Sequence, residues 1–194
     1  MTLPQFEARL AAMRASIPGV IRRSLVEVGN DSVKLLKTVY LTNGLLNVRS
    51  GLLRGSVGME VVPGSDGPSL VVFAGRSAQV KYARIHEVGG TITPKRGKFL
   101  AIPVGPARTA AGVARFSSPR QVPDLHYVQS RKGQPMLVKL KGKGRGKRAG
   151  AIEVWYILRR QVTIKPKHYM AATEVSARSD FPGVLAANLA RVLA

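Results

Sequence analysis

Apolar residues recur every three or four positions over the first 42 residues, which is the period of an amphipathic helix. Leu3, Phe6, Leu10 and Met13 form a first stripe, and Pro18 predicts a break after it. A second helix is expected to begin at that proline. Its apolar stripe consists of residues that recur at alternating intervals of four and three. These are Ile21, Leu25, Val28, Ser32, Leu35 and Val39. The stripe predicts core positions, and a coiled-coil partner is the alternative.

Short apolar runs separated by glycine and proline predict antiparallel strands further along the chain. The runs cover residues 57–62, 69–75, 98–104, 136–140, 151–158 and 162–164. PGSDGP, at 63–68, has the length and composition of a hairpin loop, so the first two strands are predicted to pair. A final stripe through Leu185, Leu189 and Val192 predicts another helix.

These patterns predict an α+β fold built as a single domain. Amphipathic helices in residues 1–42 are expected to pack on an antiparallel β-sheet formed by 50–104 and 135–175, followed by a C-terminal helix at 182–194. Residues 105–134 are rich in Pro, Ser, Ala and Arg and have no clear period, so an irregular, basic loop insertion is predicted there. A chain of 194 residues buries about 70% of its unfolded surface, which is enough for one core.

YARIHEVGGTITP, at 82–94, predicts a corner between a short helix and a strand. Ser77 is the candidate N-cap, and Tyr82, Ile85 and Val88 recur at three-residue intervals near one helix face. The polar residues between them, His86 and Glu87, are predicted to face solvent, with a catalytic role as the alternative.

A glycine pair is predicted to end this helix. Gly89 and Gly90 tolerate the left-handed backbone of a C-terminal cap. The β-branched residues that follow favour an extended segment up to Pro94.

YARIHEVGGTI and the strand KFLAIPV, at 98–104, resemble the signature of a family of tailed-bacteriophage structural proteins. These are tail-completion or neck proteins, including Mu-like virion morphogenesis proteins and minor tail components of lambdoid phages. SGLLRGSV, at 50–57, fits the same pattern. VTIKPKHYMAATEV, at 162–175, resembles the closing strand of the family, its turn at Pro166 and its final helix. The basic segment at 105–150 has no counterpart in the pattern.

The resemblance implies a structural virion protein of the head–tail junction, made in the host bacterial cytoplasm. Such a protein forms a homo-oligomeric ring of roughly six or twelve subunits around the DNA channel. Its expected partners are the phage connector, portal-side and tail proteins, together with double-stranded DNA that is bound without sequence preference. A tail-terminator ring in the same virion is an alternative.

Thirty-one Lys and Arg against ten Asp and Glu give a formal charge of +21. Such a charge favours a polyanion, and the phosphate backbone is the first candidate, with acidic neighbouring subunits as the equal alternative. A stand-alone nucleic-acid-binding protein is a further alternative. Aromatic residues make up only 6% and do not interleave with the cations, so contact with DNA is expected to be electrostatic.

KGKGRGKRAG, at 141–150, alternates glycine with cations between two predicted strands, which predicts a protruding hairpin tip without apolar content. The residues predicted to contact DNA or a partner are the cations of this tip and of the loop before it. They are Lys141, Lys143, Arg145, Lys147, Arg148, Arg131 and Lys132.

Signatures of catalysis are missing from the sequence. His86, His126 and His168 lie far apart, HExxH and Walker-type motifs are not present, and GKGRG lacks the GK[ST] ending. The chain has no cysteine, and hence no thiol chemistry. We therefore expect no enzymatic activity, cofactor or metal site. No run of about 18 apolar residues is present, so no membrane partner is expected.

Replacing the five cations of the tip by serine together is predicted to leave folding intact, because the tip has no large apolar side chain to bury. Thermal unfolding of the variant and the parent should give the same Tm. A large loss of stability would contradict the assignment of residues 141–150 to a surface tip.

Overall fold

The computed structural model describes residues 2–76, 80, 82–141 and 151–193. Its contacts divide the chain into two compact units, each with its own core: Met1–Val88 joined by Pro166–Ala194, and Gly89–Lys165. We call them the helical unit and the strand unit. The predicted α+β class with antiparallel pairing is confirmed. Where the sequence predicted a single domain, the strand unit forms an insertion within the helical one.

The first helix, α1 (Leu3–Leu35), continues through Pro18, so the predicted break there is wrong. Proline removes one hydrogen bond from the preceding turn, but its φ near −65° suits a helix. Before Val20 every described residue of α1 is exposed except the half-buried Met13 and Ser16. The carbonyl of Arg14 that loses its partner at Pro18 therefore lies in an exposed stretch, where water can bind it.

A π-helix, η1 (Leu36–Gly44), follows α1 directly. Its turns are wider than those of an α-helix, and the hydroxyl of Thr42 donates to the carbonyl of Lys37, five residues earlier, at 2.6 Å. The wider turn buries Leu36 and Leu41 and leaves Val39 47% exposed. The prediction of Val39 as a core residue is wrong because the spacing assumed an α-helical pitch.

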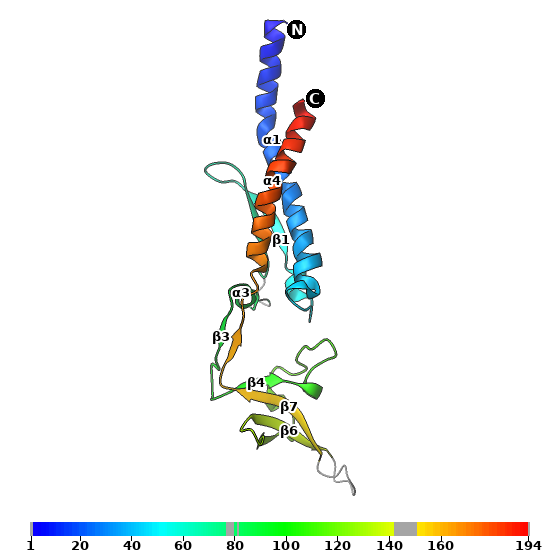
Figure 1. The fold of residues 1–194 in the computed structure, drawn as a ribbon, viewed down its shortest axis with the longest axis vertical. Helices are drawn as coiled ribbons and strands as arrows, with labels where there is room; N and C mark the ends of the chain where they lie inside the picture. The colour runs from blue at the N-terminus through cyan, green and yellow to red at the C-terminus, as the bar shows by residue number, and fades with distance from the viewer. Residues whose placement is uncertain (1, 77–79, 81, 142–150, 194) are drawn as a thin grey trace. The chain divides into compact units, whose positions relative to one another are not determined.

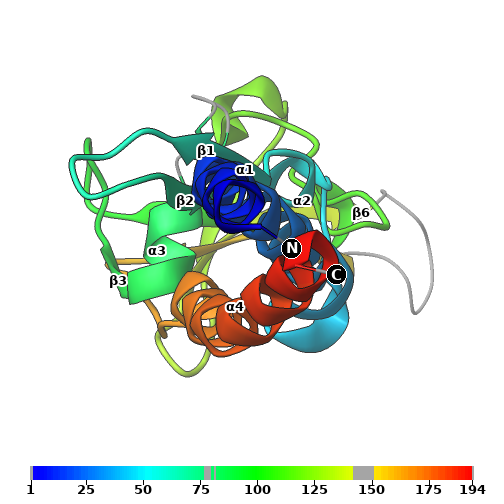
Figure 2. The ribbon, with the colours of Figure 1, turned by 90° about the horizontal axis from the view of Figure 1, so that it is seen from above.

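The C-terminal segment is one helix, α4 (Tyr169–Leu193), so the final helix of the 162–175 motif and the helix predicted at 182–194 are continuous. Pro182 lies inside it and is exposed, as Pro18 is in α1. Figures 1 and 2 show α4 lying antiparallel beside α1, with the N-terminal part of α1 extending past the end of α4.

Small residues line the seam between the two helices. Val20, Ser24, Val28 and Ser32 of α1 are buried at intervals of four. The hydroxyls of Ser24 and Ser32 donate to carbonyls of their own helix, at 2.9 and 2.7 Å, so no partner is needed across the seam.

Asn188 of α4 is a large polar side chain buried in this seam, and it is 1% exposed. Its amide donates to Ser24 Oγ at 3.1 Å and to Glu27 Oε2 at 3.0 Å, and its oxygen accepts from Arg191 at 3.0 Å. A satisfied buried amide fixes the register of the helix pair, because sliding either helix would leave it unpaired.

The predicted first hairpin is confirmed. Strands β1 (Gly58–Val62) and β2 (Ser69–Phe73) pair antiparallel after a short helix, α2 (Leu52–Gly55). The hairpin packs on α1 at Gly29, where an added Cβ would lie 2.8 Å from the side chain of Leu70. The absence of a side chain at Gly29 therefore permits the close approach.

The short helix of the corner, α3 (Ala83–Val88), buries a different face from the predicted one. Ala83 is buried, whereas Tyr82 is 37% and Val88 58% exposed. The buried hydroxyl of Tyr169 donates to the carbonyl of Ala83 at 3.0 Å, and only a small residue leaves room for that ring. The candidate N-cap, Ser77, lies outside the described residues.

Further hydrogen bonds join α3 to the start of α4, and we call this set, with the Tyr169 bond, the clasp. The amides of Lys167 and His168 donate to the carbonyls of His86 and Glu87, at 2.8 and 3.2 Å. The carboxylate of Glu87 accepts from the amides of Met170 and Ala171, at 2.9 and 3.1 Å. The prediction of a solvent-facing Glu87 is wrong, because this carboxylate satisfies the free amides of the first turn of α4.

The strand unit contains two antiparallel sheets. Strand β3 (Gly90–Ile92) pairs with β8 (Val162–Ile164). The second sheet has the order β4-β7-β6-β5, with β4 (Leu100–Pro103), β5 (His126–Gln129), β6 (Pro135–Lys141) and β7 (Ala151–Arg159). The predicted strands 98–104, 136–140, 151–158 and 162–164 are thereby confirmed.

The predicted irregular loop at 105–134 contains an unpredicted strand, β5, and two 3-10 turns, η3 (Gly105–Ala107) and η4 (Pro119–Gln121). Ala107 and Val122 of this segment pack against Tyr156 of β7, and all three are at most 5% exposed. The segment therefore supplies the core of the strand unit, which the lack of periodicity concealed.

Gly89 has a φ of +73°, in the left-handed region predicted for the cap of α3. Replacing it by valine is expected to lower the free energy of unfolding by about 1–3 kcal/mol, because a β-branched side chain resists this conformation. Urea titrations measure the loss. Asparagine, which tolerates positive φ, is the control and should retain most of the stability; equal stability of the valine variant would refute the cap.

Tyr169 makes the stability of the helical unit sensitive to alkaline pH. Burial, reinforced by the charge of Glu87, raises the pKa of Tyr169 to about 12, above the value of about 10 in an unfolded chain. The native state thus gains stability below pH 10 that is lost as the pH rises toward 12. Tyr169→Phe should cost about 1–2 kcal/mol at pH 8 and reduce the loss between pH 8 and 11. Unfolding curves at both pH values test this; an unchanged pH dependence would contradict it.

Candidate functional site

The positive charge is concentrated in the strand unit. Residues 89–165 contain seventeen Lys and Arg and two Asp and Glu, a formal charge of +15. The helical unit contains the other fourteen cations and eight carboxylates, a formal charge of +6. The strand unit is therefore the part of the chain best suited to a polyanion.

The predicted tip is described only where it leaves the sheet. Lys141 is the last residue of β6 and pairs with Ala151, the first residue of β7. This pairing confirms that the strands on either side of the tip run antiparallel. Lys143, Arg145, Lys147 and Arg148 lie outside the described residues.

The other two predicted contacts lie at the opposite end of β6. Arg131 and Lys132 are exposed in the turn between β5 and β6, closed by a bond from the amide of Gly133 to the carbonyl of Ser130 at 2.8 Å. Strand β6 has seven residues, so about 20 Å separate this turn from Lys141. The structure does not bring the two predicted groups together.

Arg131 and Lys132 instead join cations that sequence reasoning missed. Gln134, at the end of their turn, donates from its amide to the carbonyl of Leu158 at 2.6 Å, which ties the turn to the end of β7. Arg159 and Arg160 follow Leu158 and are exposed. Arg159 also pairs in register with Leu100, two residues after Lys98. We call Lys98, Arg131, Lys132, Arg159 and Arg160 the basic end.

A shallow hollow of about 240 Å³ lies beside these cations. Arg159 and Arg160 line it together with Phe99 and Tyr127, and Tyr127 is 59% exposed. The Arg-Arg pair at the end of a predicted strand was the available sequence signal. The sequence did not show that the β5–β6 turn, with its own cations, lies next to this pair.

Carboxylates do little to offset this charge. In the described part of the chain, none of the five cations of the basic end forms an ion pair. The two carboxylates of the strand unit are Asp124 and Glu153, and Glu153 accepts a bond from the indole of Trp155 at 3.1 Å. Exposed, unpaired cations at the ends of strands attract phosphates through long-range charge and impose little sequence preference.

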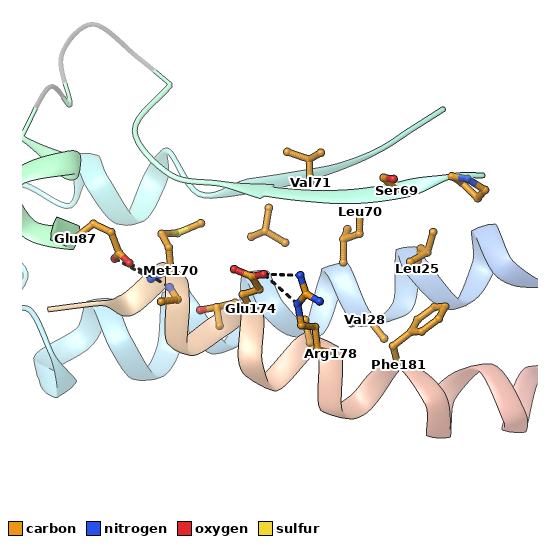
Figure 3. A pocket seen from close by; sticks show the side chains of 15 residues that line it. Leu25, Val28, Ser69, Leu70, Val71, Glu87, Met170, Glu174, Arg178 and Phe181 are labelled. Atoms are coloured by element: carbon orange, nitrogen blue, oxygen red, sulfur yellow. Dashed lines mark hydrogen bonds and ion pairs between the residues drawn. The ribbon is translucent and has the colours of Figure 1, made fainter. Parts of the chain in front are cut away.

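The helical unit has a second candidate surface, a groove of about 870 Å³ between β2, α1 and α4. Figure 3 shows Leu70 of β2, Leu25 and Val28 of α1, and Phe181 of α4 directed into it. Glu174 and Arg178 of α4 also line it and form an ion pair of 2.8 Å. We call this feature the apolar groove; its lining is suited to a hydrophobic partner.

The residues of the predicted corner have structural roles in the molecule. Tyr82 and His86 stack edge to face, with ring centroids 5.9 Å apart. Partial burial, and then the charge of Lys167, lower the pKa of His86. Pro94 is half-buried just after β3, and Pro166 is exposed where the chain re-enters the helical unit. Ile85 is half-buried.

Metal-ligating side chains are scattered in the described part of the chain. No group of three or more His, Asp or Glu lies close enough there to hold a metal ion. No described helix is long and apolar enough to cross a membrane.

No protein-family model matches this sequence, and neither curated proteins nor solved structures provide a match.

Proposed function

We propose that this chain is a structural virion protein of a tailed bacteriophage. It belongs to the neck or tail-completion class and forms a ring at the head–tail junction around the DNA channel. The strand unit contacts DNA without sequence preference, and the helical unit contacts protein. The chain carries out no bond-making chemistry in this proposal.

The observation that carries the proposal is the unequal division of charge. A formal charge of +15 on the strand unit, with five unpaired cations at the basic end, supports contact with a polyanion. The helical unit combines exposed apolar side chains with an apolar groove, which supports contact with protein. A subunit that lines a DNA channel needs both kinds of surface.

The resemblance to neck proteins provides the virion context, and the structure gives two of its motifs a common physical basis. YARIHEVGGTI and VTIKPKHYMAATEV lie side by side, joined by the clasp in the helical unit and by the β3–β8 pairing in the strand unit. Segments about 80 residues apart in sequence are thus paired within each unit. This supports treating them as one signature.

Location is the direct test. Antibody or gold labelling of purified phage particles that carry a tagged copy should place the protein at the head–tail junction. Its absence from particles would end the proposal. Labelling at the far end of the tail would also end it, whereas labelling at the upper end of the tail tube would favour a terminator ring.

The charge of the strand unit also fits a stand-alone nucleic-acid-binding protein, and the two functions differ in how the isolated chain binds. A stand-alone protein binds duplex DNA tightly as a monomer, with a steep salt dependence. A ring subunit binds weakly as a monomer and gains affinity when many copies act together. Affinity measured as a function of protein oligomerisation separates the two.

Replacing the five cations of the basic end by glutamine is predicted to weaken binding to duplex DNA and leave the fold intact. The slope of log K against log salt should fall by about 0.9 for each phosphate that the variant no longer neutralises. Thermal stability should change little, because all five side chains are exposed. Fluorescence anisotropy at several salt concentrations measures the slope.

The matched control removes five exposed cations from the helical unit: Arg22, Arg23, Lys34, Arg54 and Arg84. It has the same net charge as the test variant and should keep most of the slope. An equal loss in both variants would show that total charge, and no particular surface, governs binding.

A further inference from the structure

The first turns of α1 carry an apolar stripe that the rest of the described chain does not cover. Leu3, Phe6, Leu10 and Ile17 are 71%, 46%, 36% and 42% exposed. They are spaced for one helix face, with the half-buried Met13 between them. We call residues 3–17 the arm. Isolated helices of this length are marginal in water, so a persistent arm gains from a surface that covers this stripe.

The apolar groove is the matching surface on the same chain. Leu25, Val28, Leu70 and Phe181 line it. Strand β2 pairs only with β1 among the described strands, so its other edge is not occupied by a strand. A helix that places residues spaced by three and four into such a groove is a recurrent mode of recognition.

The arm cannot reach the groove of its own molecule. Leu25 and Val28 belong to α1 itself, and α1 is unbroken from Leu3 to Leu35. Leu10 lies 15 residues before Leu25, about 22 Å away along a rigid helix axis. An arm that enters the groove therefore belongs to another copy.

Charge favours the same pairing. The arm contains Arg9 and Arg14 against one carboxylate, Glu7. The residues that line the groove include two carboxylates, Glu87 and Glu174, and one cation, Arg178, a formal charge of −1. Glu87 accepts from the amides of Met170 and Ala171, and Glu174 pairs with Arg178. Opposite net charges at the edges of an apolar contact help to set its orientation.

We propose that the arm of one copy packs into the apolar groove of the next, so that the chain assembles head to tail. The contact joins two different surfaces and is heterologous, the kind that closes into a ring when its rotation is suitable. The inference rests on the proposed ring and specifies the contact that would build it.

Two glutamates placed in the stripe test the arm. Phe6→Glu with Leu10→Glu should make the protein monomeric at concentrations where the parent forms oligomers in sedimentation velocity runs. Ala8→Glu with Ala15→Glu adds the same charge to the opposite, exposed face of the arm and should assemble like the parent. A parent that stays monomeric at all concentrations, or equal loss of assembly in both variants, would overturn the inference.

Cross-linking identifies the groove as the receiving surface. The chain has no cysteine, so Leu10→Cys with Ala177→Cys introduces the only two thiols, one on the arm and one in the groove. Oxidation should give a ladder of dimers, trimers and larger covalent species, because each copy is linked at two different surfaces. Ala8→Cys with Ala177→Cys is the control and should give no ladder.

A covalent dimer that does not extend would indicate pairing between two arms and overturn the inference. DNA binding of the same variants separates it from the proposed function. A monomeric parent that keeps its salt-dependent DNA affinity ends the inference about the arm and leaves the DNA contact standing. A covalent ladder from a protein without DNA affinity supports the inference about the arm and contradicts the proposed DNA contact.

Discussion

The clasp is the interaction on which the rest of the structure depends. It joins residues 83–87 to residues 167–171. The two parts of the helical unit that flank the strand unit in sequence therefore meet. Closing so long a loop costs conformational entropy, which a set of hydrogen bonds at its base offsets. Glu87 serves two purposes here, because its carboxylate also supplies the partners that the first amides of α4 lack. Loss of the clasp would release both the start of α4 and the base of the insertion.

Holding α4 at its first turn directs the helix along α1, where small side chains let the two backbones approach. The hydroxyls of Ser24 and Ser32 donate to carbonyls of α1 itself. Asn188 fixes the register through hydrogen bonds to both Ser24 and Glu27. The helix pair in turn provides two walls of the apolar groove, with β2 as the third. The surfaces proposed for assembly thus follow from the same packing that stabilises the helical unit.

The division of charge gives the two units different physical properties, with a formal charge of +15 on the strand unit and +6 on the helical unit. Charge acts over about 10 Å in salt solution and needs no exact fit, which suits contact with a uniform phosphate backbone. Apolar contact acts only at short range and requires matching shapes, which suits a repeated contact between copies.

Sequence alone determined the fold class, the antiparallel hairpin at 58–73, the principal strands and the left-handed glycine at 89, because each depends on local periodicity or on a backbone preference. It did not reveal that α1 and α4 continue through Pro18 and Pro182. Both prolines are exposed, and that exposure is known only from the folded structure. It placed the irregular segment at 105–134 outside the core, whereas Ala107 and Val122 complete that core by packing on Tyr156. Net charge and the cations at 131 and 132 were readable from the chain. Their neighbours Arg159 and Arg160, and the capping role of Glu87, arise only when tertiary packing brings distant segments together, and local sequence carries no record of that proximity.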